Sequence, residues 1–207
     1  MDRRTALKNL TMSMGYAVAA PTLVSILSSC TTEVSTWEPV FFTAEEKKMV
    51  IQLVDVIIPE SAVVGGLDVN IPQFMDLMFK DIEKESNQKL FRNGAQLFAT
   101  RFKEKFGISV LDGKKDEFEE LLTQYFNLSE SKSKEILRFQ KKPIDKVLRD
   151  KKDIYNVYKF LLFVRYYSIY GYCTSEKVGE EVLSYDPIPG DYKGCISVEE
   201  VGNAWSL

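Results

Sequence analysis

The sequence predicts an all-α fold: a single irregular helical bundle around a central aromatic-rich helix, with an extended C-terminal tail rich in Pro and Gly. In the segment 153–173, fifteen of 21 residues are apolar or aromatic, and six of them are Tyr. Such a helix needs cover on most of its sides, and Lys159 and Arg165 in its middle argue against a membrane span. Capped amphipathic segments precede it, and no convincing period-two strand occurs anywhere in the chain.

The other helices follow from caps, breakers and apolar spacing. Thr43 and Glu46 form a capping box, and Pro59 stops the helix that they begin. Pro72 opens the next helix, and Gly107 closes a later one. The predicted helices span residues 43–58, 72–86, 88–106, 115–126, 130–140, a basic stretch after Pro143 that ends at 152, the central 153–173, and 176–183.

Composition excludes several classes of site. The chain has no His, which removes Ser-His-Asp catalysis and histidine metal ligands. It has no GxGxxG, GxxxxGK[ST] or CxxC motif, the common devices for nucleotides, iron–sulfur clusters and c-type haem. A net charge of −3 argues against nucleic acid as a partner. The sequence therefore predicts no catalytic residue, metal site or cofactor site in this chain.

The first thirty residues are typical of an export signal. Arg3 and Arg4 precede Thr-Ala-Leu-Lys, which is similar to a twin-arginine signal, and a weakly apolar stretch follows. Leu-Ser-Ser before Cys30 is similar to a lipobox, so Cys30 is the expected lipidation site. We expect a signal peptide over 1–29, a tether over 30–41 and a helical domain over 42–207. The protein would be periplasmic and lipid-anchored to the bacterial inner or outer membrane.

Three segments together resemble a known family. They are RRTALK, the opening helix FTAEEKKMVIQLVDVIIP, and GYCTSEKVGEEVLSYDPIPGDYKGC after the central helix. In this order they resemble the small subunit, subunit 3, of gluconate 2-dehydrogenase and related membrane-associated sugar dehydrogenases. The middle of the chain matches that family in helical character only, and Cys30 departs from its pattern.

The resemblance implies a non-catalytic subunit that escorts, stabilises and anchors a large partner. That partner would be a flavoprotein of the glucose-methanol-choline type, with FAD, that oxidises a sugar, sugar acid or polyol. A cytochrome or another carrier would take the electrons. The tail, which Pro and Gly keep extended, can gain order only by lying on its own domain or on another chain. Its candidate interface residues are Tyr172, Tyr185, Pro187, Pro189 and Tyr192.

Several alternatives remain open. Outside the cytoplasm Cys173 and Cys195 can form a disulfide, but two free thiols or a bridge to the partner are equally compatible with the sequence. The Lys- and Arg-rich stretch 132–152 is either a solvated face or a face toward an anionic membrane. The chain could instead be a free-standing periplasmic lipoprotein that binds a carbohydrate or cell-envelope component through Trp37 and Trp205. An enzyme using Asp153, or Glu180 with Glu181, is the least favoured function.

Overall fold

The computed structural model describes residues 37–185, 188, 190 and 194–206, and the fold over these residues is all-α. The chain divides into two units, and the second, Pro39–Leu207, holds the helices that are described here. They are α2 (Ala44–Ile57), α3 (Ile71–Leu77), α4 (Glu85–Phe106), α5 (Lys115–Phe126), α6 (Glu130–Gln140), α7 (Lys152–Cys173), α8 (Glu176–Glu181) and α9 (Val198–Val201). In the described part of the chain the only β pairing is an isolated bridge between Ser184 and Trp205.

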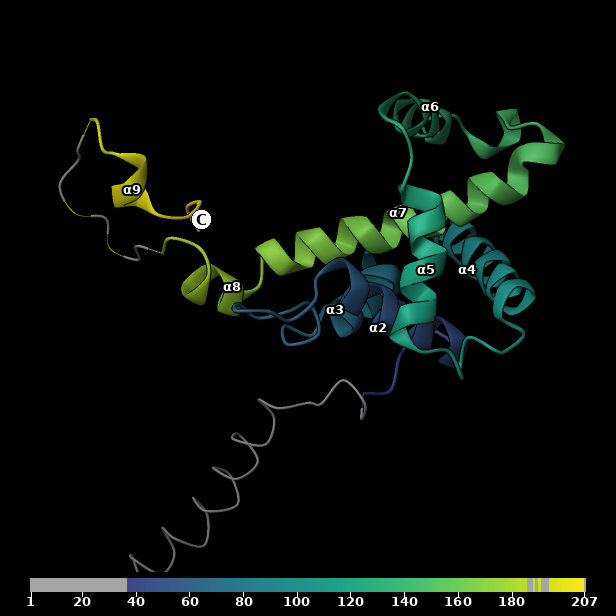
Figure 1. Cartoon of the computed structure of the whole chain (residues 1–207), viewed down its shortest axis with the longest axis horizontal. Helices are drawn as coiled ribbons and strands as arrows, with labels where there is room; N and C mark the ends of the chain where they lie inside the picture. Colours follow the sequence, from purple (N-terminus) through teal and green to yellow (C-terminus); the bar gives the residue numbers. More distant parts are fainter. Residues whose placement is uncertain (1–36, 186–187, 189, 191–193, 207) are drawn as a thin grey trace, which may run out of the picture. The chain divides into compact units, whose positions relative to one another are not determined.

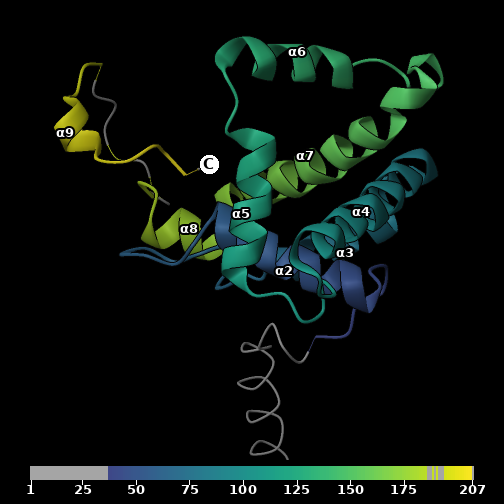
Figure 2. The same ribbon diagram turned by 45° about the vertical axis from the view of Figure 1, so that its right-hand side comes forward.

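The central helix is α7, as the sequence predicts. Helices α2, α3 and α4 pack along it, and α5 packs mainly on α2 (Figure 1). Figure 2 shows α4 and α7 side by side, in the most extensive helix contact of the bundle. No helix in the described residues is long and apolar enough to cross a membrane.

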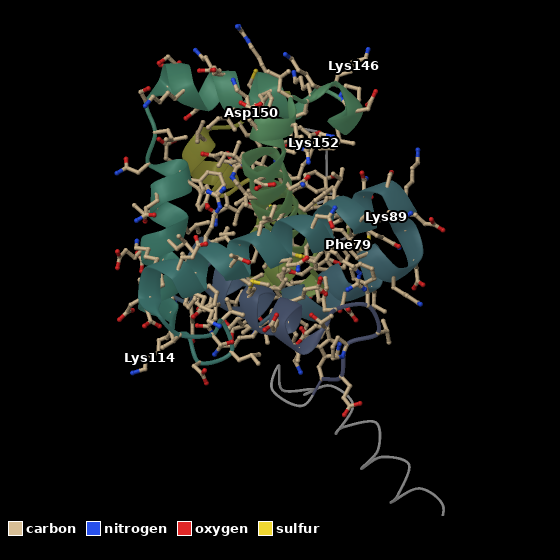
Figure 3. The ribbon with its side chains drawn as sticks, turned by 90° about the vertical axis from the view of Figure 1, so that its right-hand side faces the viewer. Phe79, Lys89, Lys114, Lys146, Asp150 and Lys152 are labelled. Atoms are coloured by element: carbon tan, nitrogen blue, oxygen red, sulfur yellow. The ribbon has the colours of Figure 1, made fainter. Side chains whose placement is uncertain are left out.

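Gly94 of α4 makes the close approach to α7 possible. A Cβ atom built on Gly94 would lie 2.2 Å from the Asn156 carbonyl oxygen and 2.6 Å from the Phe160 Cβ. Close packing of rings fills the space on either side of this contact. The rings of Phe91 and Phe160 meet edge to face with centroids 5.1 Å apart, and Phe79 lies 4.3 Å from Phe91 (Phe79 is labelled in Figure 3). The core is therefore aromatic where the turn that follows α3, which contains Phe79, meets α4 and α7.

The segment before α2 is clamped onto α3 and α4. The buried carboxylate of Asp76 accepts hydrogen bonds from the backbone N–H groups of Val40, Phe41 and Phe42 at 2.7, 3.0 and 2.8 Å. Arg92 donates to the Phe41 carbonyl at 2.8 Å and to Glu46 at 2.9 Å, and its guanidinium carbon lies 4.2 Å from the centre of the Phe41 ring. These groups, called the N-terminal clamp below, satisfy backbone donors that no helix or strand satisfies.

Helices α2, α5 and α6 agree with the sequence-based expectation. The Thr43 hydroxyl accepts from the Glu46 N–H at 3.2 Å, and Glu46 accepts from the Thr43 N–H at 2.8 Å, so the capping box is confirmed. Helix α4 ends at Phe106, as predicted, and is capped by Gly107, whose φ of +74° is a left-handed conformation that glycine adopts without strain. These termini are set by interactions within a few residues, which is why local patterns locate them.

Two predicted helices are wrong in part. The helix expected over 72–86 ends in a π-helical turn, Met78–Ile82, which the Glu83 N–H closes on the Met78 carbonyl. The Gln88 side chain, one turn into α4, binds the Phe79 carbonyl at 2.7 Å and so bridges the break between the two helices. The basic helix expected after Pro143 is instead two 3₁₀ turns, Ile144–Lys146 and Arg149–Lys151. Between them the buried Val147 holds the segment against the bundle in an extended conformation.

Three Tyr hydroxyls of α7 donate hydrogen bonds to groups outside the helix. Tyr155 donates to the Lys142 carbonyl, Tyr158 to the Tyr125 carbonyl and Tyr167 to the Glu83 carboxylate, at 2.8, 3.1 and 2.6 Å. Burial and then the hydrogen bond to Glu83 raise the pKa of Tyr167 above its ordinary value. Burial also raises the pKa of Tyr155 and of Tyr158.

These pKa shifts predict a loss of stability in alkali. A tyrosine with a raised pKa in the folded state keeps its proton after the unfolded chain has lost it, at about pH 10. The stabilisation that results from the raised pKa is complete below about pH 10. It declines as the pH rises through the pKa of the unfolded state and toward the pKa of the folded state. We expect the free energy of unfolding, measured by urea titration, to fall more steeply above pH 10 in the wild type than in Tyr167→Phe. An equally steep fall in Tyr167→Phe would contradict this assignment, and Tyr166→Phe, whose ring is exposed, is the control.

Candidate functional site

The C-terminal half of α7 leaves one strip of its surface uncovered. Tyr166, Ile169, Tyr170 and Cys173 stand at positions i, i+3, i+4 and i+7 of the helix, so they share one side of it, and all four are exposed. We call this strip the Tyr166 face. The rings of Tyr166 and Tyr170 are stacked, with centroids 5.9 Å apart and planes 2° from parallel. The face is thus an apolar and aromatic surface on a helix whose other apolar side chains are buried or half-buried.

The Tyr166 face continues onto α3. The ring of Phe74 lies 6.1 Å from that of Tyr170, and Leu77, one turn further along α3, is exposed. Gly171 allows this approach, because a Cβ atom there would lie 2.7 Å from the ring of Phe74. On the covered side of α7, the Tyr167 hydroxyl is anchored to Glu83. Two helices with fixed packing therefore hold the surface in place.

The tail folds back onto the region beyond α7. The Ser184 N–H donates to the Ala204 carbonyl and the Ser206 N–H donates to the Ser184 carbonyl, both at 2.9 Å. The Asn203 side chain donates to the Val182 carbonyl at 2.6 Å. A shallow pocket of about 220 Å³ lies beside this bridge, next to the end of the Tyr166 face. Its lining residues are Cys173, Thr174, Ser175, Glu176, Gly179, Glu180, Tyr185 and Ser206.

The candidate interface residues of the sequence divide into three groups. Tyr172 is half-buried, and its hydroxyl donates to the Val64 carbonyl at 2.7 Å, so it pins the loop before α3 to the end of α7. Burial raises the pKa of Tyr172. Tyr185 is exposed and lines the pocket. Pro187, Pro189 and Tyr192 lie outside the described residues.

The export and lipidation residues Arg3, Arg4 and Cys30 also lie outside the described residues. Of the alternatives for Cys173 and Cys195, the disulfide between them is not formed in the structure, in which both are free and exposed. Of the two Trp residues considered for carbohydrate binding, Trp205 is half exposed and Trp37 is partly buried.

The carboxylates considered for catalysis do not converge. Asp153 lies at the start of α7, whereas Glu180 and Glu181 lie in α8, beyond the far end of that helix. At 1.5 Å per residue, the length of α7 places Asp153 about 30 Å from this pair. Glu180 and Glu181 are consecutive residues of a helix, so their side chains project about 100° apart. The first turns of α5 also carry four carboxylates, and these face solvent or make structural contacts. Glu117 accepts from the Lys114 N–H at 2.7 Å, and Glu120 pairs with Lys105 at 2.7 Å. Within the ranges that the structure describes, no three Cys, Asp or Glu side chains are grouped to hold a metal ion.

The Tyr166 face is not predictable from apolar spacing, because apolar residues surround α7 almost completely. The sequence signal for this face is that α7 carries more apolar surface than the neighbouring helices cover.

Comparison with known proteins indicates the family of the chain. No curated protein and no solved structure matches the chain. The sequence model of the family described as gluconate 2-dehydrogenase subunit 3 matches residues 44–190, a segment that contains α2 to α8 and the whole Tyr166 face. The chain therefore belongs to the gluconate 2-dehydrogenase subunit 3 family.

Proposed function

We propose that this chain is a non-catalytic small subunit that escorts, stabilises and anchors a flavin-dependent sugar or sugar-acid dehydrogenase. Family membership supports an accessory subunit associated with a larger dehydrogenase subunit. In this proposal the large subunit holds FAD and performs the oxidation, and a cytochrome or other carrier accepts the electrons. The small subunit contributes binding surface, an export signal and a lipid anchor.

The observation that carries the proposal is the exposed Tyr166 face. Aromatic side chains are enriched where protein interfaces are tightest, because they bury a large area with few rotatable bonds. Tyr166 and Tyr170 are already ordered by stacking on each other, and Tyr170 also packs against the tilted ring of Phe74, so binding would cost them little conformational entropy. The adjoining pocket beside Tyr185 offers a concave site for a side chain of the partner.

In this proposal the N-terminal residues direct export and attach the complex to the membrane. Arg3 and Arg4 would direct the folded complex to the twin-arginine route, so that a partner without its own signal is carried along. Lipidation of Cys30 would attach the complex to the membrane, since two or more acyl chains bind a bilayer stably. A periplasmic location follows from both.

The test is co-expression of this chain with the large dehydrogenase subunit that it accompanies. We expect the two to co-purify from membranes with flavin absorbance, and Tyr166→Ser with Tyr170→Ser to lower the recovered flavoprotein at least tenfold. Because both rings are exposed, the free energy of unfolding should change by less than about 1 kcal/mol. Replacing Arg3 and Arg4 with Lys should leave the flavoprotein in the cytoplasm.

The control is Leu111→Ser, which removes an exposed leucine between α4 and α5 and should not affect co-purification. If the double Tyr variant retains the flavoprotein fully, the Tyr166 face is not the interface. If flavin or dehydrogenase activity purifies with this chain alone, the non-catalytic role is wrong.

A further inference from the structure

We propose that α6 and the two 3₁₀ turns after it form a binding surface for an anionic phospholipid bilayer. Residues 132–152 contain nine Lys or Arg against three Asp or Glu, whereas the whole chain has 27 against 30. Eight of these nine cations are exposed. Among the described residues, only Lys134 of this group has an ion pair, with Glu130 in the preceding turn.

The outward side of α6 combines charge with an exposed leucine. Lys134, Leu137, Arg138 and Lys141 are spaced at i, i+3, i+4 and i+7, so they share one side of the helix, and all four are exposed. Leu137 is 51% exposed, between cations one turn before and one turn after it. Leu148, in the next turns, is 66% exposed and adjoins Arg149. A leucine surrounded by Lys and Arg is the pattern of helices that lie in the interface of a membrane.

The opposite side of α6 is fastened to α7, which fixes the direction of the cations. The ring of Phe139 meets that of Tyr155 edge to face at 5.4 Å, and the Gln140 side chain donates to the Tyr155 carbonyl at 3.2 Å. Lys159 donates to the Gln140 carbonyl at 2.9 Å, and Tyr155 donates to the Lys142 carbonyl at 2.8 Å. Figure 3 shows Lys146 at the same edge of the bundle as α6.

An anionic bilayer fits this surface better than an acidic protein does. A flat bilayer can contact cations from a helix and from two separate turns at once, and its acyl region accepts Leu137 and Leu148. The inference is independent of the proposed function, because no residue of the Tyr166 face takes part in it.

The experiment uses the full chain with Cys30→Ser in every variant, which removes the candidate acylation site. Binding is measured by flotation with vesicles of phosphatidylcholine containing 30% phosphatidylglycerol, and with phosphatidylcholine alone. We expect preference for the anionic vesicles, which high salt weakens. Lys134→Gln, Arg138→Gln and Lys141→Gln together should lower the partition coefficient about 100-fold, at roughly fivefold per cation. Leu137→Gln should lower it about tenfold.

The matched control removes the same charge elsewhere: Lys80→Gln, Lys84→Gln and Lys103→Gln, all exposed and all before α5. We expect it to change vesicle binding less than threefold. If the α6 triple variant binds anionic vesicles like the wild type, or if the control triple loses as much, the proposal is wrong. It is also wrong if the α6 triple variant keeps vesicle binding but loses the large dehydrogenase subunit, since the surface would then be a protein interface.

Discussion

Replacing Asp76 with alanine is expected to lower the free energy of unfolding by about 4 kcal/mol, the larger of two predicted losses of stability. The carboxylate accepts three backbone hydrogen bonds in a buried site, from Val40, Phe41 and Phe42. Alanine would leave these N–H groups without an acceptor and would open space beneath Phe42, which is itself buried. Urea or thermal denaturation measures the loss, which corresponds to about 10 °C in Tm.

Asn is the informative second substitution at this position. In the wild type one oxygen, Oδ1, accepts from Phe41 and Phe42, and the other, Oδ2, accepts from Val40. An amide oxygen in the Oδ1 position would keep two of the three bonds but lose the charge, so we expect a loss of about 2 kcal/mol. Asp81→Ala removes an exposed carboxylate from the adjoining π-helical turn and should change stability by less than about 0.5 kcal/mol. Equal stability of Asp76→Ala and Asp81→Ala would show that the clamp contributes nothing.

The N-terminal clamp also shows that sequence patterns predict local structure but not contacts between distant segments. Thr43 and Glu46 predict the start of α2, because all the residues of a capping box lie within four positions of one another. The three N–H groups before α2 donate to Asp76, which is more than thirty residues away in the sequence. No local pattern shows that an Asp inside a helix will accept hydrogen bonds from so distant a segment. The start of α2 is therefore predictable from the sequence, whereas the hydrogen bonds of Asp76 to the segment before it are not.

The same distinction applies to the site. The sequence places Tyr172 in a candidate interface, and the structure adds that its hydroxyl donates to the Val64 carbonyl within the domain. For Tyr166 and Tyr170 the sequence predicts only a helix that is covered on most of its sides. Periodicity shows which sides of a helix are apolar, not how many neighbours are available to cover them. In α7 the neighbouring helices leave one strip uncovered.

Gly94→Ala provides the second large effect, and its sign is the opposite of what helix propensity predicts. In an exposed helix this change would stabilise by up to about 1 kcal/mol. Here the new methyl carbon would lie 2.2 Å from the Asn156 carbonyl oxygen and 3.0 Å from the Asn156 carbonyl carbon, both backbone atoms of α7. No side-chain rotation relieves such a contact, so α4 and α7 must separate. We expect a net loss of about 3 kcal/mol in the free energy of unfolding.

Asn93→Ala is the matched control, since it places alanine at the neighbouring exposed position of α4 and should be neutral or slightly stabilising. A Gly94→Ala variant as stable as Asn93→Ala would show that the two helices are not as close as the structure has them. The variant also links packing to function. α7 carries the Tyr166 face at one end and holds α6 at the other, so a shift of α7 displaces both surfaces together. Gly94→Ala protein that still folds should therefore be impaired both in recovery of the large subunit and in vesicle binding, whereas the surface variants each impair one.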